Sequence, residues 1–131
     1  MADSSADPLV APIAGAVHRS VGGVDEDVVE AGDARIKRVV YPAGYRWSTH
    51  LGPTVGTALC MHAHVGFLVQ GQMQVEYPDG CTVVYTAPQP VLVDPGHDAC
   101  VIGDETAVLV QVDFERDTIG RFNLPPTHTH A

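Results

Sequence analysis

The chain has 131 residues and carries 7 basic against 16 acidic side chains, a formal net charge of −9. That length suits one domain, and an acidic surface repels phosphate backbones, so we expect no nucleic-acid partner. No stretch approaches the roughly 20 apolar residues of a membrane span, and the start of the chain lacks the basic residues of a signal peptide. We therefore expect a cytoplasmic protein without a membrane partner.

Residues 1–33 differ in composition from the remainder of the chain. They are rich in acidic and small residues, contain Arg19 as their one basic residue and show no sustained hydrophobic period. We expect an N-terminal arm with a short strand or turn, which a partner subunit could hold in place.

From Ile36 onward, short β-branched segments alternate with turn residues. Strands are expected at 36–41, 57–64, 66–77, 81–86, 91–93, 99–102 and 107–114, with a break at Gly71 and turns at 78–80 and 94–96. Many short strands at hairpin spacing predict an all-β jelly-roll barrel or sandwich over residues 34–114. Residues 115–131 are expected to form a C-terminal strap and tail.

The spacing of glycines, histidines and a cysteine resembles the cupin superfamily. When the first cupin motif is placed on Gly52 and Gly71, its metal-ligand positions fall on Ala58, Cys60 and His64. In the second motif the ligand position falls on Ala99, with His97 two residues earlier. The segments Trp47-Ser48-Thr49-His50 and Pro95-Gly96-His97-Asp98-Ala99 resemble a group of small bacterial cupins. The resemblance covers about residues 38–114 and implies a double-stranded β-helix with a central pocket that commonly pairs into a homodimer.

The residues at or near the cupin ligand positions predict a metal site. The predicted ligands are Cys60, His62, His64 and His97, with His50 as an alternative fourth ligand to His62. Thiolate and imidazole suit a divalent transition metal such as Zn, Fe or Ni better than Mg or Ca. An iron centre with two histidines and a carboxylate would need Asp94 or Asp98 in place of the missing glutamate.

Three functional hypotheses stay open. The first two place a small-molecule ligand in the pocket, and the third treats the pocket as vestigial. Trp47, His50 and Phe67 are the predicted substrate contacts. The first hypothesis is a metal-dependent enzyme of dioxygenase, isomerase or lyase type. The second is a ligand-binding or sensing cupin without metal, in which the histidines serve only as hydrogen-bond donors. The third is a dimer module whose cavity is filled by bulky side chains behind Ala58 and Ala99.

Other polar residues are interpreted more simply. An odd count of three cysteines argues against a disulfide framework, so Cys81 and Cys100 are expected to be small core residues. Arg46 and Arg121 could pair with a substrate carboxylate, but a surface salt bridge is the simpler expectation. The tail at 127–130 is expected to be a flexible end.

Overall fold

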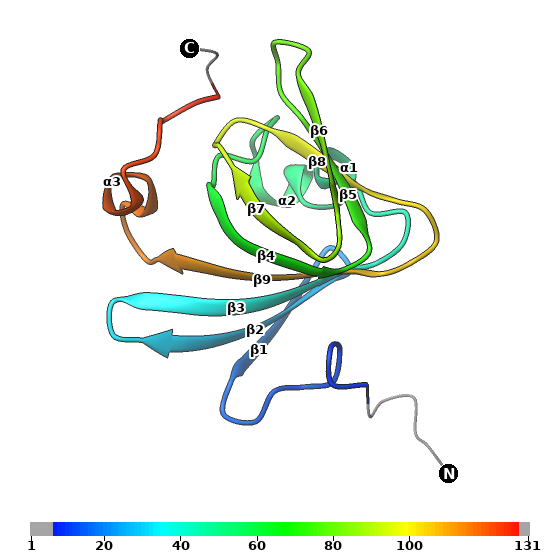
Figure 1. The fold of residues 1–131 in the computed structure, drawn as a ribbon, viewed down its shortest axis with the longest axis vertical. Helices are drawn as coiled ribbons and strands as arrows, with labels where there is room; N and C mark the ends of the chain where they lie inside the picture. The colour runs from blue at the N-terminus through cyan, green and yellow to red at the C-terminus, as the bar shows by residue number, and fades with distance from the viewer. Residues whose placement is uncertain (1–6, 129–131) are drawn as a thin grey trace.

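A computed structural model describes residues 7–128, which form two antiparallel β-sheets facing each other (Figure 1). The strands are β1 (Val17–Val21), β2 (Val24–Ala31), β3 (Ala34–Tyr41), β4 (His64–Gln70), β5 (Gln72–Glu76), β6 (Thr82–Thr86), β7 (Gln89–Val93), β8 (Asp98–Ile102) and β9 (Ala107–Phe114). The short helices are α1 (Trp47–His50), α2 (Gly52–Val55) and α3 (Thr118–Phe122). One sheet has six strands in the order β1-β2-β3-β9-β4-β7, and the other has three in the order β6-β5-β8. The predicted all-β jelly-roll barrel is therefore confirmed.

The predicted break at Gly71 is the point where the chain passes from one sheet to the other. Gly71 has a φ of +84°, and a Cβ there would lie 2.8 Å from the Cα of Ala107. Only glycine accepts both the left-handed conformation and this close backbone approach. As a result β4 belongs to the large sheet and β5 to the small one, and the space between them becomes the interior of the barrel.

The expected strand over 57–64 is absent. Residues 47–55 form α1 and α2 instead, and the chain then runs irregularly until β4 begins at His64. Pro53 in the first turn of α2 and Gly56, which ends that helix at a φ of +89°, explain the local conformation. Within 57–63, only Cys60 makes an isolated β-bridge, and its partner is His97.

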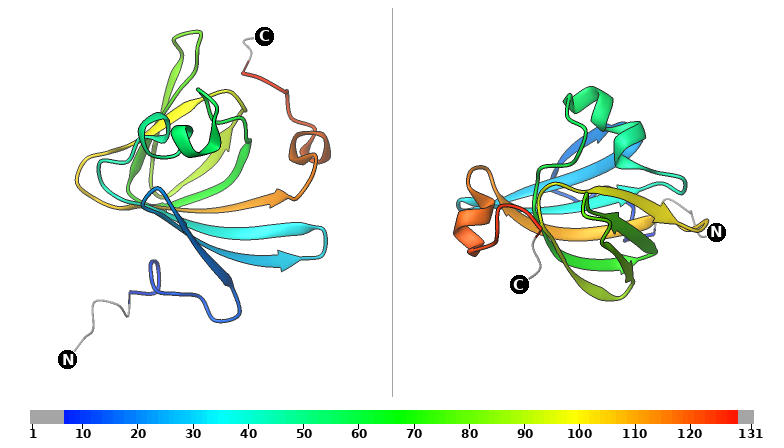
Figure 2. Two further views of the ribbon diagram at one scale, coloured as in Figure 1. Left: turned by 180° about the vertical axis from the view of Figure 1, so that it is seen from behind. Right: turned by 90° about the horizontal axis from the view of Figure 1, so that it is seen from above.

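The segment expected to be an arm contributes two strands to the large sheet. β1 and β2 form a hairpin that pairs with β3, extending the sheet beyond the barrel (Figures 1 and 2). Alternation along β2 sends Glu26 towards the cavity and buries Asp27 on the opposite face. One acid of this acidic segment is therefore buried in the sheet and not exposed to solvent.

Residues 8–13 are held on the outer face of this sheet by a buried ion pair. The Arg38 guanidinium donates to the carbonyls of Leu9 and Ala11 at 2.9 and 2.8 Å, while Asp27 accepts from the backbone N–H of Ile13 at 2.6 Å. Burial would raise the pKa of Asp27, but hydrogen bonds from Ile13 and His18 and the Arg38 charge outweigh it and lower that pKa. Contacts within the chain itself thus fix this segment.

The described part of the C-terminal tail is docked on the barrel. The ring of His128 stacks on Tyr77, with centroids 3.8 Å apart, and its Nδ1 lies 3.2 Å from a carboxylate oxygen of Asp94. Thr129 and His130, the other residues of the expected flexible end, lie outside the described residues. Across residues 7–128, the helices are all too short to cross a bilayer.

Candidate functional site

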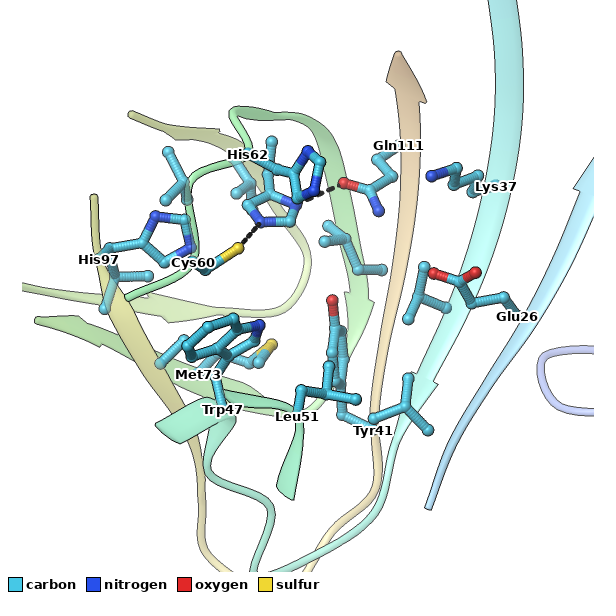
Figure 3. A pocket seen from close by; sticks show the side chains of 18 of the residues that line it. Glu26, Lys37, Tyr41, Trp47, Leu51, Cys60, His62, Met73, His97 and Gln111 are labelled. Carbon is cyan, nitrogen blue, oxygen red and sulfur yellow. Dashed lines mark hydrogen bonds between the residues drawn. The ribbon is translucent and has the colours of Figure 1, made fainter. Parts of the chain in front are cut away.

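The barrel encloses an open-mouthed cavity of about 560 Å³, which both sheets, α1 and the loop before β4 line (Figure 3). Its deep end is apolar and includes Trp47, Leu51 and Met73. Its polar end includes Cys60, His64, His97 and several charged side chains. The volume falls within the range typical of small-molecule sites.

Cys60, His64 and His97 converge at one wall of the cavity. One ligand atom from each lies within 4.8 Å of the other two, and Cys60 Sγ is 3.6 Å from His64 Nε2. Backbone hydrogen bonds in both directions between Cys60 and His97, at 2.8 and 3.1 Å, hold these two residues side by side. His64 joins them because it is the first residue of β4, directly after the loop that carries Cys60.

Hydrogen bonds fix the tautomer of both imidazoles. His64 Nδ1–H donates to Oε1 of Gln111 at 2.7 Å, and His97 Nδ1–H donates to the backbone carbonyl of Asp94 at 2.7 Å. Both acceptors are oxygens without a proton, so each Nδ1 must carry the hydrogen. The lone pair of each ring is therefore on Nε2. This is the arrangement found in metal-binding histidines whose other ring nitrogen donates to an oxygen atom of the protein.

Burial determines the protonation of the three groups. Burial, with the neighbouring His97, lowers the pKa of His64 to about 3 in spite of the opposing hydrogen bond to Gln111. Burial also lowers the pKa of His97, although its bond to the Asp94 carbonyl acts in the other direction. Burial raises the pKa of the Cys60 thiol to about 11, and the Asp98 charge adds to this effect. In the absence of an ion, the site at neutral pH thus holds two neutral imidazoles and one thiol.

The remaining predicted site residues take different positions. His62 lines the rim of the cavity and is exposed, outside the group of three convergent ligands. Trp47 lines the cavity and is buried. His50 does not line the cavity; its Nδ1 lies 3.0 Å from the backbone nitrogen of Arg46, and its ring stacks on Tyr45. Phe67 is 42% exposed and also lies outside the lining, because in β4 it alternates with the buried Leu68.

Neither candidate carboxylate replaces the missing glutamate. Asp98 accepts hydrogen bonds from Arg46 and from the Ser48 hydroxyl, at 2.9 and 2.7 Å. The Asp94 carboxylate instead contacts His128, 3.2 Å away. Arg46 also pairs with Glu76 at 2.9 Å, so its salt bridges anchor α1 to the small sheet.

A second group of potential ligands lies outside the cavity. One ligand atom each from Asp79, Cys81 and His128 lies within 4.8 Å of the other two, at the β5–β6 turn and the C-terminal tail. This group supplies a built-in comparison for any metal-binding experiment.

Gln111 is the site residue that our sequence interpretation missed. It is 5% exposed and lies on β9 opposite Gly66, with its amide oxygen committed to His64. The sequence did contain a signal for Gln111: it is a single amide among the valines and the leucine of β9, and it lies on the same face of the strand as Leu109. A polar residue at a buried position in a strand requires a partner, and that requirement could have identified it.

No family model matches the sequence, and no curated protein matches it either. Solved structures do resemble its fold. A Cupin 2 conserved barrel domain protein from Salinispora arenicola has a TM-score of 0.56 at 15% identity, over 87% of this chain and 94% of that chain. The cupin domain of Schizosaccharomyces pombe Cnp3 has a TM-score of 0.54 at 13% identity, over 85% and 77%. KdgF from Halomonas sp. has a TM-score of 0.53 at 18% identity, over 77% and 88%. With two sheets closing around a cavity and these neighbours, the chain has the cupin fold.

Proposed function

We propose that this protein binds one divalent transition metal ion on Cys60, His64 and His97 and acts on a small organic molecule in the adjoining cavity. The observation that carries the proposal is the convergence of three ligand atoms within 4.8 Å, on imidazoles whose Nδ1 hydrogens are already committed elsewhere. Nε2 is the free ligand nitrogen of each ring, so binding requires no change of tautomer.

The donor set favours zinc, iron or nickel. One sulfur and two imidazole nitrogens match the ligand preferences of these ions, whereas Mg²⁺ and Ca²⁺ prefer oxygen. Asp94 and Asp98 are engaged elsewhere, which disfavours a two-histidine, one-carboxylate iron centre. Zinc is therefore the first candidate.

Three protein ligands would leave a four-coordinate ion with one position for water or a ligand. A metal ion held in this way can polarise a bound water or a ligand oxygen. The cavity of about 560 Å³ provides room for that ligand, and Ala99 is part of its lining. This volume argues against the hypothesis of a vestigial, filled barrel.

Metal content is the direct test of the proposal. Protein purified without a nickel column should contain about one transition metal ion per chain from the Cys60 group. His64→Ala should lose that ion, and Cys60→Ser should hold it more weakly, on the two imidazoles alone, so that it loads only with added metal; both variants should remain folded by circular dichroism. His128→Ala is the matched control, because it removes a histidine from the second group and leaves the cavity intact.

Two results would contradict the proposal. One is folded wild-type protein that neither contains nor takes up Zn²⁺, Fe²⁺ or Ni²⁺, which would favour the metal-free ligand-binding hypothesis. The other is metal that survives in His64→Ala and disappears in His128→Ala, which would assign the ion to the second group.

A further inference from the structure

The polar end of the cavity results from alternation along two paired strands. On β3, the inward residues run from Arg35 and Lys37 at one end to Val39 and Tyr41 at the other. β9 pairs with β3 in a register that sets Gln111 directly opposite Lys37. Directly opposed residues have Cβ atoms about 5 Å apart, so an ammonium group and an amide share one part of the wall.

The Gln111 amide points hydrogen-bond donors into the cavity. Its oxygen accepts from His64 Nδ1–H, which fixes the orientation of the planar amide and directs the NH₂ group elsewhere. No hydrogen bond joins this NH₂ group to residues 7–128, and its nitrogen is not among the fully buried atoms that lack a partner, so it is accessible from the cavity that Gln111 lines. Figure 3 shows the NH₂ group of Gln111 on the side away from the dashed hydrogen bond that its oxygen makes. A ligand or water in the cavity can therefore accept a hydrogen bond from it.

Tyr41 adds a third donor. Its hydroxyl points into the middle of the cavity (Figure 3), and the described residues offer it no hydrogen-bond partner. Burial, with the Cys60 and Glu26 charges, raises the pKa of Tyr41, so it stays a neutral phenol that can donate.

The charge of the cavity wall is opposite in sign to that of the whole chain. Arg35 and Lys37 share a single carboxylate, Asp113, at 2.8 Å from each. The charged residues of the lining are Arg19, Glu26, Arg35, Lys37 and Asp113, which leaves one net positive charge. A chain with a formal charge of −9 thus has a net-positive wall beside an electroneutral group of histidines and thiol.

The deep end of the cavity has no such charges. Trp47, Leu51 and Met73 face one another there, and Trp47 and Met73 are buried (Figure 3). This surface fits a hydrocarbon or aromatic body.

We propose that the cavity binds a small organic acid, with its carboxylate on Lys37 and the Gln111 amide and its apolar body against Trp47 and Met73. This proposal rests on the proposed function in one respect: it names the class of molecule that occupies the cavity beside Cys60, His64 and His97. It requires no metal for recognition of the acid, so the two proposals can fail separately.

The test uses matched acid and amide probes. Binding of 3-phenylpropionate and octanoate, each compared with its neutral primary amide, is measured by isothermal titration calorimetry on Zn²⁺-loaded and chelator-treated full-length protein. At least one acid should bind about tenfold or more tightly than its amide in both preparations, because a charge-assisted bond has no counterpart in the amide.

Two variants localise the effect. Lys37→Met removes the charge and keeps much of the side-chain volume. Gln111→Glu still offers an oxygen to His64 Nδ1–H, but it replaces the NH₂ donors with a negative charge. Each should weaken acid binding about tenfold and weaken amide binding by a smaller factor, because the amide carries no charge. Arg116→Met, at an exposed position outside the cavity lining, removes the same charge and should have no effect.

The proposal is overturned if neither acid binds, if acid and amide bind equally, or if both variants bind the acid as the wild type does. Acid binding that needs Zn²⁺ and ignores both variants would mean coordination by the ion alone, and it also overturns this subsite. The protein could also bind the acid through Lys37 and Gln111 and take up no metal. That result would support this subsite and contradict only the metal proposal.

Discussion

The pH dependence of metal affinity should separate the thiol from the imidazoles. Metal binding must displace the proton of Cys60, whose pKa of about 11 leaves it protonated at every pH from 5 to 8. His64, with a pKa of about 3, and His97, whose pKa is also lowered, are already neutral over most of this range. One proton should therefore be released for each ion bound.

The magnitude follows from that count. One released proton changes the affinity about tenfold per pH unit, so Zn²⁺ should bind about 100-fold more weakly at pH 5 than at pH 7. Two histidines with the ordinary pKa of 6.5 would each add roughly a further 25-fold loss, for a total of roughly 10⁴ to 10⁵. The two cases differ by more than two orders of magnitude.

Competition with a chromophoric chelator, whose own pH dependence is known, measures this difference. The slope of log affinity against pH should be about one for the wild type and close to zero for Cys60→Ser, because serine has no thiol proton to release. A wild-type slope near two or three would show that the histidines are protonated in the metal-free protein. A wild-type slope near zero would show that Cys60 is not a ligand.

Three further outcomes are expected. As the pH falls from 6.5 to 3, the free energy of unfolding of metal-free protein should decrease by at most about 5 kcal/mol through His64, because this residue is protonated in the unfolded chain and stays neutral in the folded chain. In urea titrations the stability difference between wild type and His64→Gln should therefore be larger at pH 7 than at pH 4. A difference that does not change with pH would refute the lowered pKa of His64. Gly66→Ala should cost about 1–3 kcal/mol or more in the same assay, since its Cβ would overlap the Val110 carbonyl and lie 2.7 Å from the Gln111 Cα, whereas equal stability would mean that β4 and β9 can separate freely. Finally, we predict a homodimer formed through the outer face of the large sheet, where Phe67 is 42% exposed. Phe67→Glu should sediment as a 13.9 kDa monomer. A wild-type protein that is itself monomeric would contradict the predicted dimer.

The strands of the barrel were predictable because their ends carry specific turn chemistry. Gly71 and the turn at 78–80 separate β4, β5 and β6 as expected from the sequence. The conformation of residues 57–64 was predicted wrongly, because loose apolar alternation resembles a strand even where no neighbouring strand is available to pair with it. Cys60 pairs with a single residue, His97, so its bridge cannot extend into a ladder.

The N-terminal region and the polar wall depend on pairing that composition does not reveal. Asp27 is a solvated acid by composition, yet the sheet places it beside Arg38 in a buried ion pair. Cys60 and His64 could be nominated because they fall on cupin ligand positions, and His97 because it lies two residues before the position that falls on Ala99. Gln111 could be recognised only as a buried amide in need of a partner; that its partner is His64 could not be predicted, because this depends on the register of β9 against β4.

The metal–ligand distances in Zn²⁺-loaded protein test the central claim most directly. The zinc K-edge X-ray absorption spectrum should show one sulfur at about 2.3 Å and two imidazole nitrogens at about 2.0–2.1 Å. In Cys60→Ser the sulfur contribution should vanish, and in Cys81→Ser, which alters the second ligand group, it should persist. A spectrum with only oxygen and nitrogen neighbours in the wild type, or sulfur that is lost only in Cys81→Ser, would contradict the account.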